Sequence, residues 1–303
     1  MYDVLVCGSL NMDWVARVAH LPCPGETVAG TSLQRLPGGK GLNQAIAAAR
    51  LGARTAIIGA CGDDADGAAL LATLAREQVD HSRVQRRSEC ATGLAQVLVA
   101  DSGENAIVVH SAANGTLRIA ELDWAPTRIA LAQLETPLVA VAAFFEAARE
   151  AGVRTMLNPA PAIVDALPLL ADVDLVVLNE IELAVFSAAA AREAGADGIR
   201  FARPVDAAMV LLEGRCQAVI VTLGAEGAWL VTGEDAVHFP APVVTVVDTT
   251  GAGDCFCGVL AAALAQGLDL EVAIARAVAA ASRAVTRSGA APSMPRVLEL
   301  ETP

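Results

Sequence analysis

The residues with the clearest chemical potential lie near the end of the chain, in the run Asp248-Thr249-Thr250-Gly251-Ala252-Gly253-Asp254. An apolar stretch follows, so this run is expected to lead into a helix that begins at about Asp254. The main-chain amides of Gly251, Ala252 and Gly253 would then lack partners within the helix and could stabilise a developing negative charge. A carboxylate at 254 could accept the proton of an attacking hydroxyl. Alternatively, Asp254 is only a helix cap.

A second glycine run lies near the N-terminus, at Gly38-Gly39-Lys40-Gly41-Leu42-Asn43-Gln44-Ala45, shortly after Asn11-Met12-Asp13. Glycines allow the backbone to approach a ligand closely. Asn11, Asp13 and Asn43 are residue types that can bind the paired hydroxyls of a polyol, and Glu135 is expected at the end of a strand. Taken alone, Asn11 and Asp13 are also typical of turns, and Glu135 of a helix cap.

The glycine run at 38–45 precedes the run at 248–254 by more than 200 residues. In this order, the two runs resemble the two signatures of the ribokinase-like (PfkB-type) carbohydrate kinases. The resemblance extends over nearly the whole chain. It implies an ATP-dependent sugar kinase in which Asp254 is the catalytic base and the 251–253 amides form the anion hole. Lys40 would lie near the transferred phosphate. The implied sugar-binding residues are Asn11, Asp13, Gly39, Lys40, Asn43, Glu135 and Asp254.

Two further segments resemble the nucleotide site of this family. Asn179-Glu180-Ile181-Glu182 matches an Asn-x-x-Glu motif in which the Asn lies by the phosphates and Glu182 orders Mg²⁺ through water, since Mg²⁺ keeps most of its waters. The same residues also fit a capping box at a helix start, and both interpretations can hold. Thr222 to Gly227 resembles a loop around ATP, although alone it would be read as a hairpin turn. The implied nucleotide-binding residues are Asn179, Thr222, Gly224, Gly227 and Gly253.

The resemblance also implies a monovalent-cation site beside the anion hole, which would make K⁺ an activator. Most of its ligands would be main-chain carbonyls, so residue types constrain it weakly. The matching positions are Asp248, Thr250, Ala284, Arg287, Gly289 and Ser293. One position departs from the pattern, because Val278 stands where relatives often place His or Asn against the adenine.

Within the family, the Lys-containing glycine run and Leu157-Asn158-Pro159-Ala160-Pro161 favour ribose as the acceptor, phosphorylated at O5 to ribose 5-phosphate. Deoxyribose, fructose and other PfkB-type substrates are alternatives, as is a non-catalytic sugar sensor on the same fold. A dinucleotide oxidoreductase is disfavoured, because the first strand leads into Gly8-Ser9-Leu10-Asn11, with one glycine where that motif needs three.

Strand-like and helix-like segments alternate along the chain, which predicts an α/β fold with a doubly wound, mostly parallel sheet flanked by helices, in a single domain over 1–303. Two segments, Glu26 to Leu36 and Gly93 to Val109, lack helical periodicity. The second reads as a hairpin, so an antiparallel ribbon is expected to form a small lid, with strands at about 12–38 and 92–112. Residues 187–204 are interpreted as a helical excursion. Closing helices are expected at about Asp254 to Gln266 and Leu270 to Arg287.

Composition limits the partners. The formal net charge of −13 disfavours nucleic acid and anionic membranes. Charged residues interrupt each apolar stretch before the roughly 18 to 20 residues of a membrane span. Met1-Tyr2-Asp3 does not resemble a signal peptide.

Seven scattered cysteines without a CxxC pair are read as free thiols in a reducing cytoplasm, and the Cys255/Cys257 pair is weak evidence for a metal.

An apolar-faced ribbon on a protein surface is stable when its outer face is covered. In the carbohydrate kinases that this chain resembles, the lids of two subunits cover each other, so the resemblance implies a homodimer through the lid.

Overall fold

The computed structural model describes residues 2–119, 124, 127–196, 198 and 201–300. In these ranges, a nine-stranded sheet has the order β13-β12-β11-β10-β9-β8-β1-β4-β5. Neighbours from β5 to β11 run parallel, whereas β12 is antiparallel to β11 and to β13. The strands are β1 (Val4–Cys7), β4 (Thr55–Gly62), β5 (Asp80–Arg87), β8 (Ile129–Gln133), β9 (Arg154–Asn158), β10 (Leu175–Asn179), β11 (Ala218–Thr222), β12 (Ala228–Thr232) and β13 (Ala236–Phe239).

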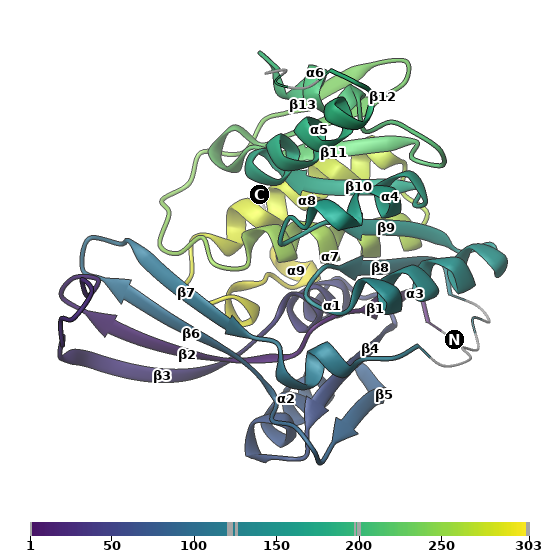
Figure 1. Cartoon of the computed structure of the whole chain (residues 1–303). Helices are drawn as coiled ribbons and strands as arrows, with labels where there is room; N and C mark the ends of the chain where they lie inside the picture. Colours follow the sequence, from purple (N-terminus) through teal and green to yellow (C-terminus); the bar gives the residue numbers. More distant parts are fainter. Residues whose placement is uncertain (1, 120–123, 125–126, 197, 199–200, 301–303) are drawn as a thin grey trace.

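Helices cover both faces of this sheet (Figure 1). Successive side chains of a strand point to opposite faces, and in β1 Val4 and Val6 join one core while Leu5 and Cys7 join the other. The first core is closed by α1 (Lys40–Arg50), α2 (Ala65–Arg76), α7 (Ala252–Ala265) and α8 (Leu270–Ala284). The second is closed by α3 (Leu138–Glu150), α4 (Leu167–Ala171), α5 (Glu180–Glu193) and α6 (Pro204–Met209). A short α9 (Val297–Leu300) follows α8. The predicted fold class is thus confirmed.

A smaller sheet, which we call the lid, projects from the edge of the main body (Figure 1). It comprises β3 (Gly30–Gly38), β2 (Asn11–Val18), β6 (Gly93–Ala100) and β7 (Asn105–His110), in that order. The hairpin between β6 and β7 is antiparallel as predicted, but β2 and β6 pair in parallel, so the expectation of a purely antiparallel ribbon was wrong. The reason is connectivity, since β2 follows β1 and β6 follows β5, and β1 and β5 run in the same direction.

Several local boundaries differ from those expected. The helical excursion expected over 187–204 holds only to the end of α5, because Gly195 adopts a left-handed φ of 80° after the helix and Pro204 starts α6; residues 197, 199 and 200 lie outside the described part. The strand β5 was not predicted, because an edge strand of sequence DHSRVQRR carries no apolar run. The helix α8 ends at Ala284 instead of Arg287. No helix of the described ranges is both long and apolar enough to cross a bilayer.

The topology determines where a ligand can bind. From β1 the chain continues on one side through β4 and β5 and on the other through β8 and β9. In doubly wound sheets, ligands bind outside the carboxyl ends of the strands at such a switch point. The ends of β1, β8, β9, β10 and β11 therefore face the expected site.

The helices α1 and α7 approach each other closely at Gly258, and this contact aligns the segments that carry the site. A Cβ added at Gly258 would lie 2.4 Å from the main-chain oxygen of Gln44 and 2.6 Å from the Cβ of Ala47. Only a glycine lets the two backbones pack at this distance.

We therefore predict that Gly258→Ala lowers the free energy of unfolding by about 1–3 kcal/mol, because the extra methyl group overpacks the interface. Urea denaturation followed by circular dichroism measures this. The matched control is Gly233→Ala, where an added Cβ meets no atom within 4 Å, so the change should stay within about 0.5 kcal/mol. Equal effects of the two substitutions would contradict the packing argument.

Candidate active site

Asp254 lies on the first turn of α7 with only 8% of its surface exposed. Its carboxylate is held by two consecutive residues of α1: Asn43 Nδ2 donates to Oδ2 at 2.9 Å, and Gln44 Nε2 donates to Oδ1 at 3.0 Å. In the described part of the chain, the hydrogen bonds to this carboxylate thus come from α1 and not from the turn that a helix cap would bond. The orientation of Asp254 is set by the contact between two helices.

A network of buried amides fixes Gln44 in turn. Its Oε1 accepts a hydrogen bond from Gln133 Nε2 at 2.6 Å, and its Nε2 also donates to Asn158 Oδ1 at 3.0 Å. Asn158 Nδ2 donates to the main-chain oxygen of Val177 at 2.9 Å. Sequence reasoning did not assign this role to Gln44, Gln133 or Asn158. Their positions in the sequence could have indicated this role, because Gln44 belongs to the glycine run and Gln133 and Asn158 are the last residues of β8 and β9.

The N-terminus of α7 leaves two of the three predicted anion-hole amides without a main-chain partner in the described residues, those of Gly251 and Gly253, whereas the Ala252 N–H already donates to the main-chain oxygen of Thr249 at 3.2 Å. Gly251 precedes the helix in the left-handed conformation, with φ of 76°, and its backbone packs against Ala290, whose Cβ would lie 2.8 Å from a Cβ added at Gly251. A Cβ added at Gly253 would meet no atom, so that side of the turn is open. The helix begins at Ala252, two residues before the expected start, which places Asp254 further into its first turn.

A cavity of about 190 Å³ lies in front of this turn and is lined by residues of both predicted subsites. Gly251, Ala252, Gly253 and Asp254 form one wall. The other lining residues that had been predicted from the sequence are Lys40, Asn179, Glu182 and Thr222. The structure therefore brings together glycine runs that are more than 200 residues apart in sequence.

On the sugar side, Asn11 is buried at the start of the lid and is oriented by Asn114, whose Nδ2 donates to Asn11 Oδ1 at 2.8 Å. Asn114 was not predicted. Glu135 Oε2 accepts hydrogen bonds from the main-chain nitrogen of Lys40 at 3.1 Å and from the hydroxyl of Ser9. Polar groups from the first strand, the glycine run and the end of β8 thus converge.

Two more predicted residues adjoin these groups. Asp13 abuts Gly38, where an added Cβ would lie 2.1 Å from a carboxylate oxygen. Burial, together with the charges of Glu135 and Asp254, raises the pKa of Asp13 to about 7. Gly39, with φ of 91°, leaves no room for a side chain, because a Cβ there would lie 2.8 Å from the main-chain nitrogen of Asn11.

Lys40 is the basic side chain that lines the cavity beside Asp254. Burial opposes its charge, but nearby carboxylates outweigh that effect and raise the pKa of the ammonium. Those carboxylates are Asp254, Glu135 and Glu182. A cation held in this way can approach a phosphate at the cavity while remaining charged.

Asn43 has one unused group. Its Oδ1 is buried and has no hydrogen-bond partner within the described residues. Unpaired buried acceptors cost free energy, and Asn43 Oδ1 is one of several buried side-chain atoms of the described residues that lack a partner.

The nucleotide-side predictions fall around the ends of β10 and β11. Asn179 and Glu182 form a capping box, with Asn179 Oδ1 accepting from the nitrogen of Glu182 at 2.9 Å and Glu182 Oε2 accepting from that of Asn179 at 3.0 Å. Glu182 nevertheless also lines the 190 Å³ cavity, and burial raises the pKa of its carboxyl. Both interpretations of the motif therefore fit the geometry.

Beside it lies a second cavity of about 350 Å³, shared by Thr222, Gly224, Gly227, Gly253 and Val278. Gly224 and Gly227 have φ of 56° and 94°, which favour glycine. Val278 stands in this wall together with other apolar side chains, which suits a flat, weakly polar group.

The loop segments predicted to hold a monovalent cation are joined by Asp248. Its Oδ1 accepts from the nitrogen of Thr250 at 2.9 Å, and its Oδ2 from the nitrogen of Gly289 at 2.8 Å. Burial by itself would raise the pKa of Asp248, but these hydrogen bonds lower the pKa below its ordinary value. The Arg287 guanidinium pairs with Glu299, so a contribution from Arg287 would come through its carbonyl.

The remaining members of that set flank these loops. Ala284 ends α8, and Ser293 is buried with its hydroxyl donating to the main-chain oxygen of Ala290 at 2.8 Å. The described residues contain no cluster of three or more His, Cys, Asp or Glu side chains that could hold a metal by themselves.

Comparison with known proteins decides the family. A family model described as pfkB family carbohydrate kinase matches residues 1–297. The chain belongs to this family. It is therefore a carbohydrate kinase, an enzyme class that transfers a phosphoryl group to an alcohol, as the sequence resemblance implied.

Three relatives of this pfkB-family kinase are informative. Ribokinase of Haemophilus influenzae is 38% identical over 295 residues, covering 96% of this chain and 94% of that protein. Deoxyribokinase of Salmonella typhi is 31% identical over 308 residues, covering 97% and 96%. The structure of Arabidopsis thaliana ribokinase with ribose and ATP superimposes with a TM-score of 0.85 at 31% identity, covering 98% and 97% of the two chains.

The shifted pKa of Asp13 gives a pH prediction for this kinase. The unfolded carboxyl ionises near pH 4, so between about pH 4 and pH 7 the folded protein holds a proton that the unfolded chain has released. The free energy of unfolding must fall as pH rises through this window. Asp13→Asn removes the titration, and its stability relative to wild type should increase by about 2–3 kcal/mol from pH 5 to pH 8.

Urea denaturation at several pH values, without ligand, measures this difference. Asp101→Asn, on the exposed turn of the lid, is the control and should follow the wild-type pH dependence. Parallel curves for wild type and Asp13→Asn would disprove the shifted titration.

Proposed function

We propose that this protein transfers the γ-phosphoryl group of ATP to O5 of D-ribose, producing ribose 5-phosphate and ADP. The observation that carries the proposal is the position of Asp254. Its carboxylate lies at the first turn of α7, beside the main-chain amides of Gly251 and Gly253 on one side and the sugar-side residues on the other. The similarity to ribokinases supports the choice of sugar.

In the proposed mechanism, Asp254 accepts the proton of the O5 hydroxyl while O5 attacks the γ-phosphorus in line. A bond forms between O5 and the phosphorus, and the bond from the phosphorus to the β–γ bridging oxygen breaks, with its electron pair leaving on ADP. The amides of Gly251, Ala252 and Gly253 stabilise the charge of the transferring group, and Lys40 neutralises part of it. Asn43 and Gln44 keep the carboxylate directed at the hydroxyl.

The sugar side favours a ligand with several hydroxyls. Asn11, Asp13, Asn43 and Glu135 bring several polar groups together there. Ribose supplies hydroxyls on neighbouring carbons, whereas deoxyribose lacks one and would leave a buried group unpaired. One such loss costs about 1–3 kcal/mol. This argument ranks ribose above deoxyribose, although relatives acting on either sugar are similar to the chain.

The nucleotide side of the site suits ATP and the cations proposed to accompany it. The 350 Å³ apolar cavity with Val278 suits the adenine, and the 190 Å³ cavity suits the phosphates. Mg²⁺, which supplies charge neutralisation to the phosphates, would be held through water by Glu182 near Asn179. K⁺ would be held by Asp248, Thr250 and Ser293 together with the carbonyls of Ala284, Arg287 and Gly289. The oxygen-rich loops joined by Asp248 support this assignment.

A second function, a sugar sensor without catalysis, would keep the sugar-side residues but would not need the carboxylate beside the open amides. The two hydrogen bonds that orient the Asp254 carboxylate favour the kinase. The seven free thiols support a reducing compartment, and we propose the cytoplasm.

A panel of ribose, deoxyribose, fructose, adenosine and fructose 6-phosphate, with ATP consumption as readout, tests this proposal. Ribose should give the highest kcat/KM, roughly 10- to 100-fold above deoxyribose. Asp254→Asn should lower kcat by about 10²- to 10⁴-fold, because the base is lost, while ribose binding measured by calorimetry remains. Turnover that survives in Asp254→Asn would refute the mechanism, and a preference for another sugar would refute the substrate.

We also propose that the lid mediates a homodimer. Large apolar side chains of the lid are exposed, namely Trp14, Leu33, Ile107, Val108 and Val109. By strand register, Ile107 and Val109 lie on one face of the lid and Trp14, Leu33 and Val108 on the other. Monomeric proteins rarely leave large apolar side chains uncovered in such numbers.

Light scattering should accordingly give twice the chain mass for the wild type. Ile107→Asp should shift the protein toward monomer by placing a charge on the lid face that Ile107 shares with Val109. Val272→Asp is the control, because Val272 is comparably exposed but lies on α8, away from the lid. A monomeric wild type, or equal dissociation of the two variants, would rule out the lid interface.

A further inference from the structure

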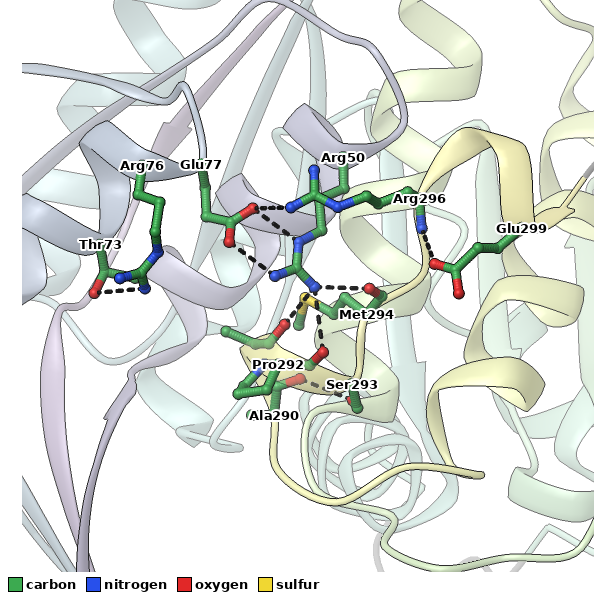
Figure 2. Close-up of polar contacts among 11 residues, drawn as sticks. Arg50, Thr73, Arg76, Glu77, Ala290, Pro292, Ser293, Met294, Arg296 and Glu299 are labelled. Carbon is green, nitrogen blue, oxygen red and sulfur yellow. Dashed lines mark hydrogen bonds and ion pairs between the residues drawn. The ribbon is translucent and has the colours of Figure 1, made fainter.

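Arg50, the last residue of α1, lies at a junction of three segments that the proposed chemistry has not used (Figure 2). Only 10% of its side chain is exposed. Its Nε and one terminal nitrogen donate to the two carboxylate oxygens of Glu77, each at 2.9 Å. The other terminal nitrogen donates to the main-chain oxygens of Ala291 and Met294, both at 2.7 Å.

The fork geometry of this contact is specific to arginine. A guanidinium presents several donors in one plane and can bind a carboxylate with two parallel hydrogen bonds while another nitrogen serves a different acceptor. Glu77, which follows α2, is only 7% exposed and also pairs with Arg296 at 3.1 Å. Arg50 therefore connects α1, the end of α2 and the segment 290–294.

The segment that Arg50 holds is also part of the wall behind the anion hole. Ala290 packs against the backbone of Gly251, and the neighbouring Gly289 donates its N–H to Asp248. The Ser293 hydroxyl donates to the carbonyl of Ala290. A shift of 290–294 would thus be transmitted directly to the turn that presents the amides at 251–253.

We infer that Arg50 is a positioning residue for phosphoryl transfer. From the C-terminus of α1 it fixes the 290–294 segment, and this segment fixes the Gly251 turn. The N-terminal part of the same helix holds Asp254 through Asn43 and Gln44. One helix thereby supports the carboxylate of the base from one end and the turn of the anion hole from the other. The inference rests on the proposed catalytic role of those amides.

The experiment compares Arg50→Met, which keeps an unbranched apolar side chain and removes the donors, with Arg76→Met. Arg76 lies in the same region, where its guanidinium donates to Thr73 Oγ1 at 3.4 Å (Figure 2). A double variant, Arg50→Met with Glu77→Gln, removes the buried carboxylate that the single variant leaves with Arg296 as its remaining partner. It keeps the test valid if the single variant folds poorly.

With ribose and ATP, Arg50→Met and the double variant should lose about 10- to 100-fold in kcat, since small misplacements of catalytic groups have effects of this size. The KM for ribose should change little, because the sugar-side residues are untouched. Arg50→Lys should recover part of kcat, and Arg76→Met should match the wild type. Hydrogen exchange should become faster in 247–253 and 287–294, relative to the rest of the chain. The stabilisation by KCl over NaCl, measured as a rise in Tm, should shrink in the same variants.

A double variant with wild-type kcat, or exchange that increases equally throughout the chain, would overturn the inference and leave Arg50 a purely structural residue. Failure of the proposed function is distinguishable, because it would appear as a wild-type protein without ribose turnover. In that case the exchange experiment alone decides whether Arg50 fixes the Gly251 turn.

Discussion

The rest of this site depends on the hydrogen bonds that two amide side chains donate to one carboxylate. Asn43 and Gln44 come from the N-terminal part of α1, and Asp254 comes from the first turn of α7. Two helix starts must therefore meet at the carboxyl ends of the parallel strands, and Gly258 allows the helices to approach closely enough. The buried amides of Gln133 and Asn158 complete the support, so the carboxylate has one defined orientation before any ligand arrives.

The electrostatics of the site differ from those of the whole protein. The chain carries a formal net charge of −13, and the carboxyl groups of Asp13, Glu135, Glu182 and Asp254 surround the sugar and phosphate regions. An anionic nucleotide would be repelled by this field alone. Lys40 and the amides at the start of α7 provide a local site for an anion. The acidic surroundings would also favour cations that accompany the phosphates, as proposed for Mg²⁺.

The sequence allowed the fold class to be predicted because strand-like and helix-like segments alternate clearly, and it allowed the groups around Asp254 to be proposed because glycine runs mark helix starts. It did not identify Gln133, Asn158 or Asn114. Each of these is a polar residue at the end of an element, and its partner lies far away in the sequence, so no local pattern distinguishes it from a turn residue. The parallel pairing of β2 with β6 was missed for the same reason, since strand partners are chosen by tertiary contacts. The edge strand β5 was missed because its sequence carries no apolar run.

The account is tested most directly by a crystal structure of the protein with ribose and a non-hydrolysable ATP analogue. It predicts that O5 of ribose lies about 2.6–3.2 Å from a carboxylate oxygen of Asp254, with the γ-phosphate analogue facing the amides of Gly251, Ala252 and Gly253. A complex in which Asp254 points away from O5, or in which the terminal phosphate contacts another part of the protein, would contradict it.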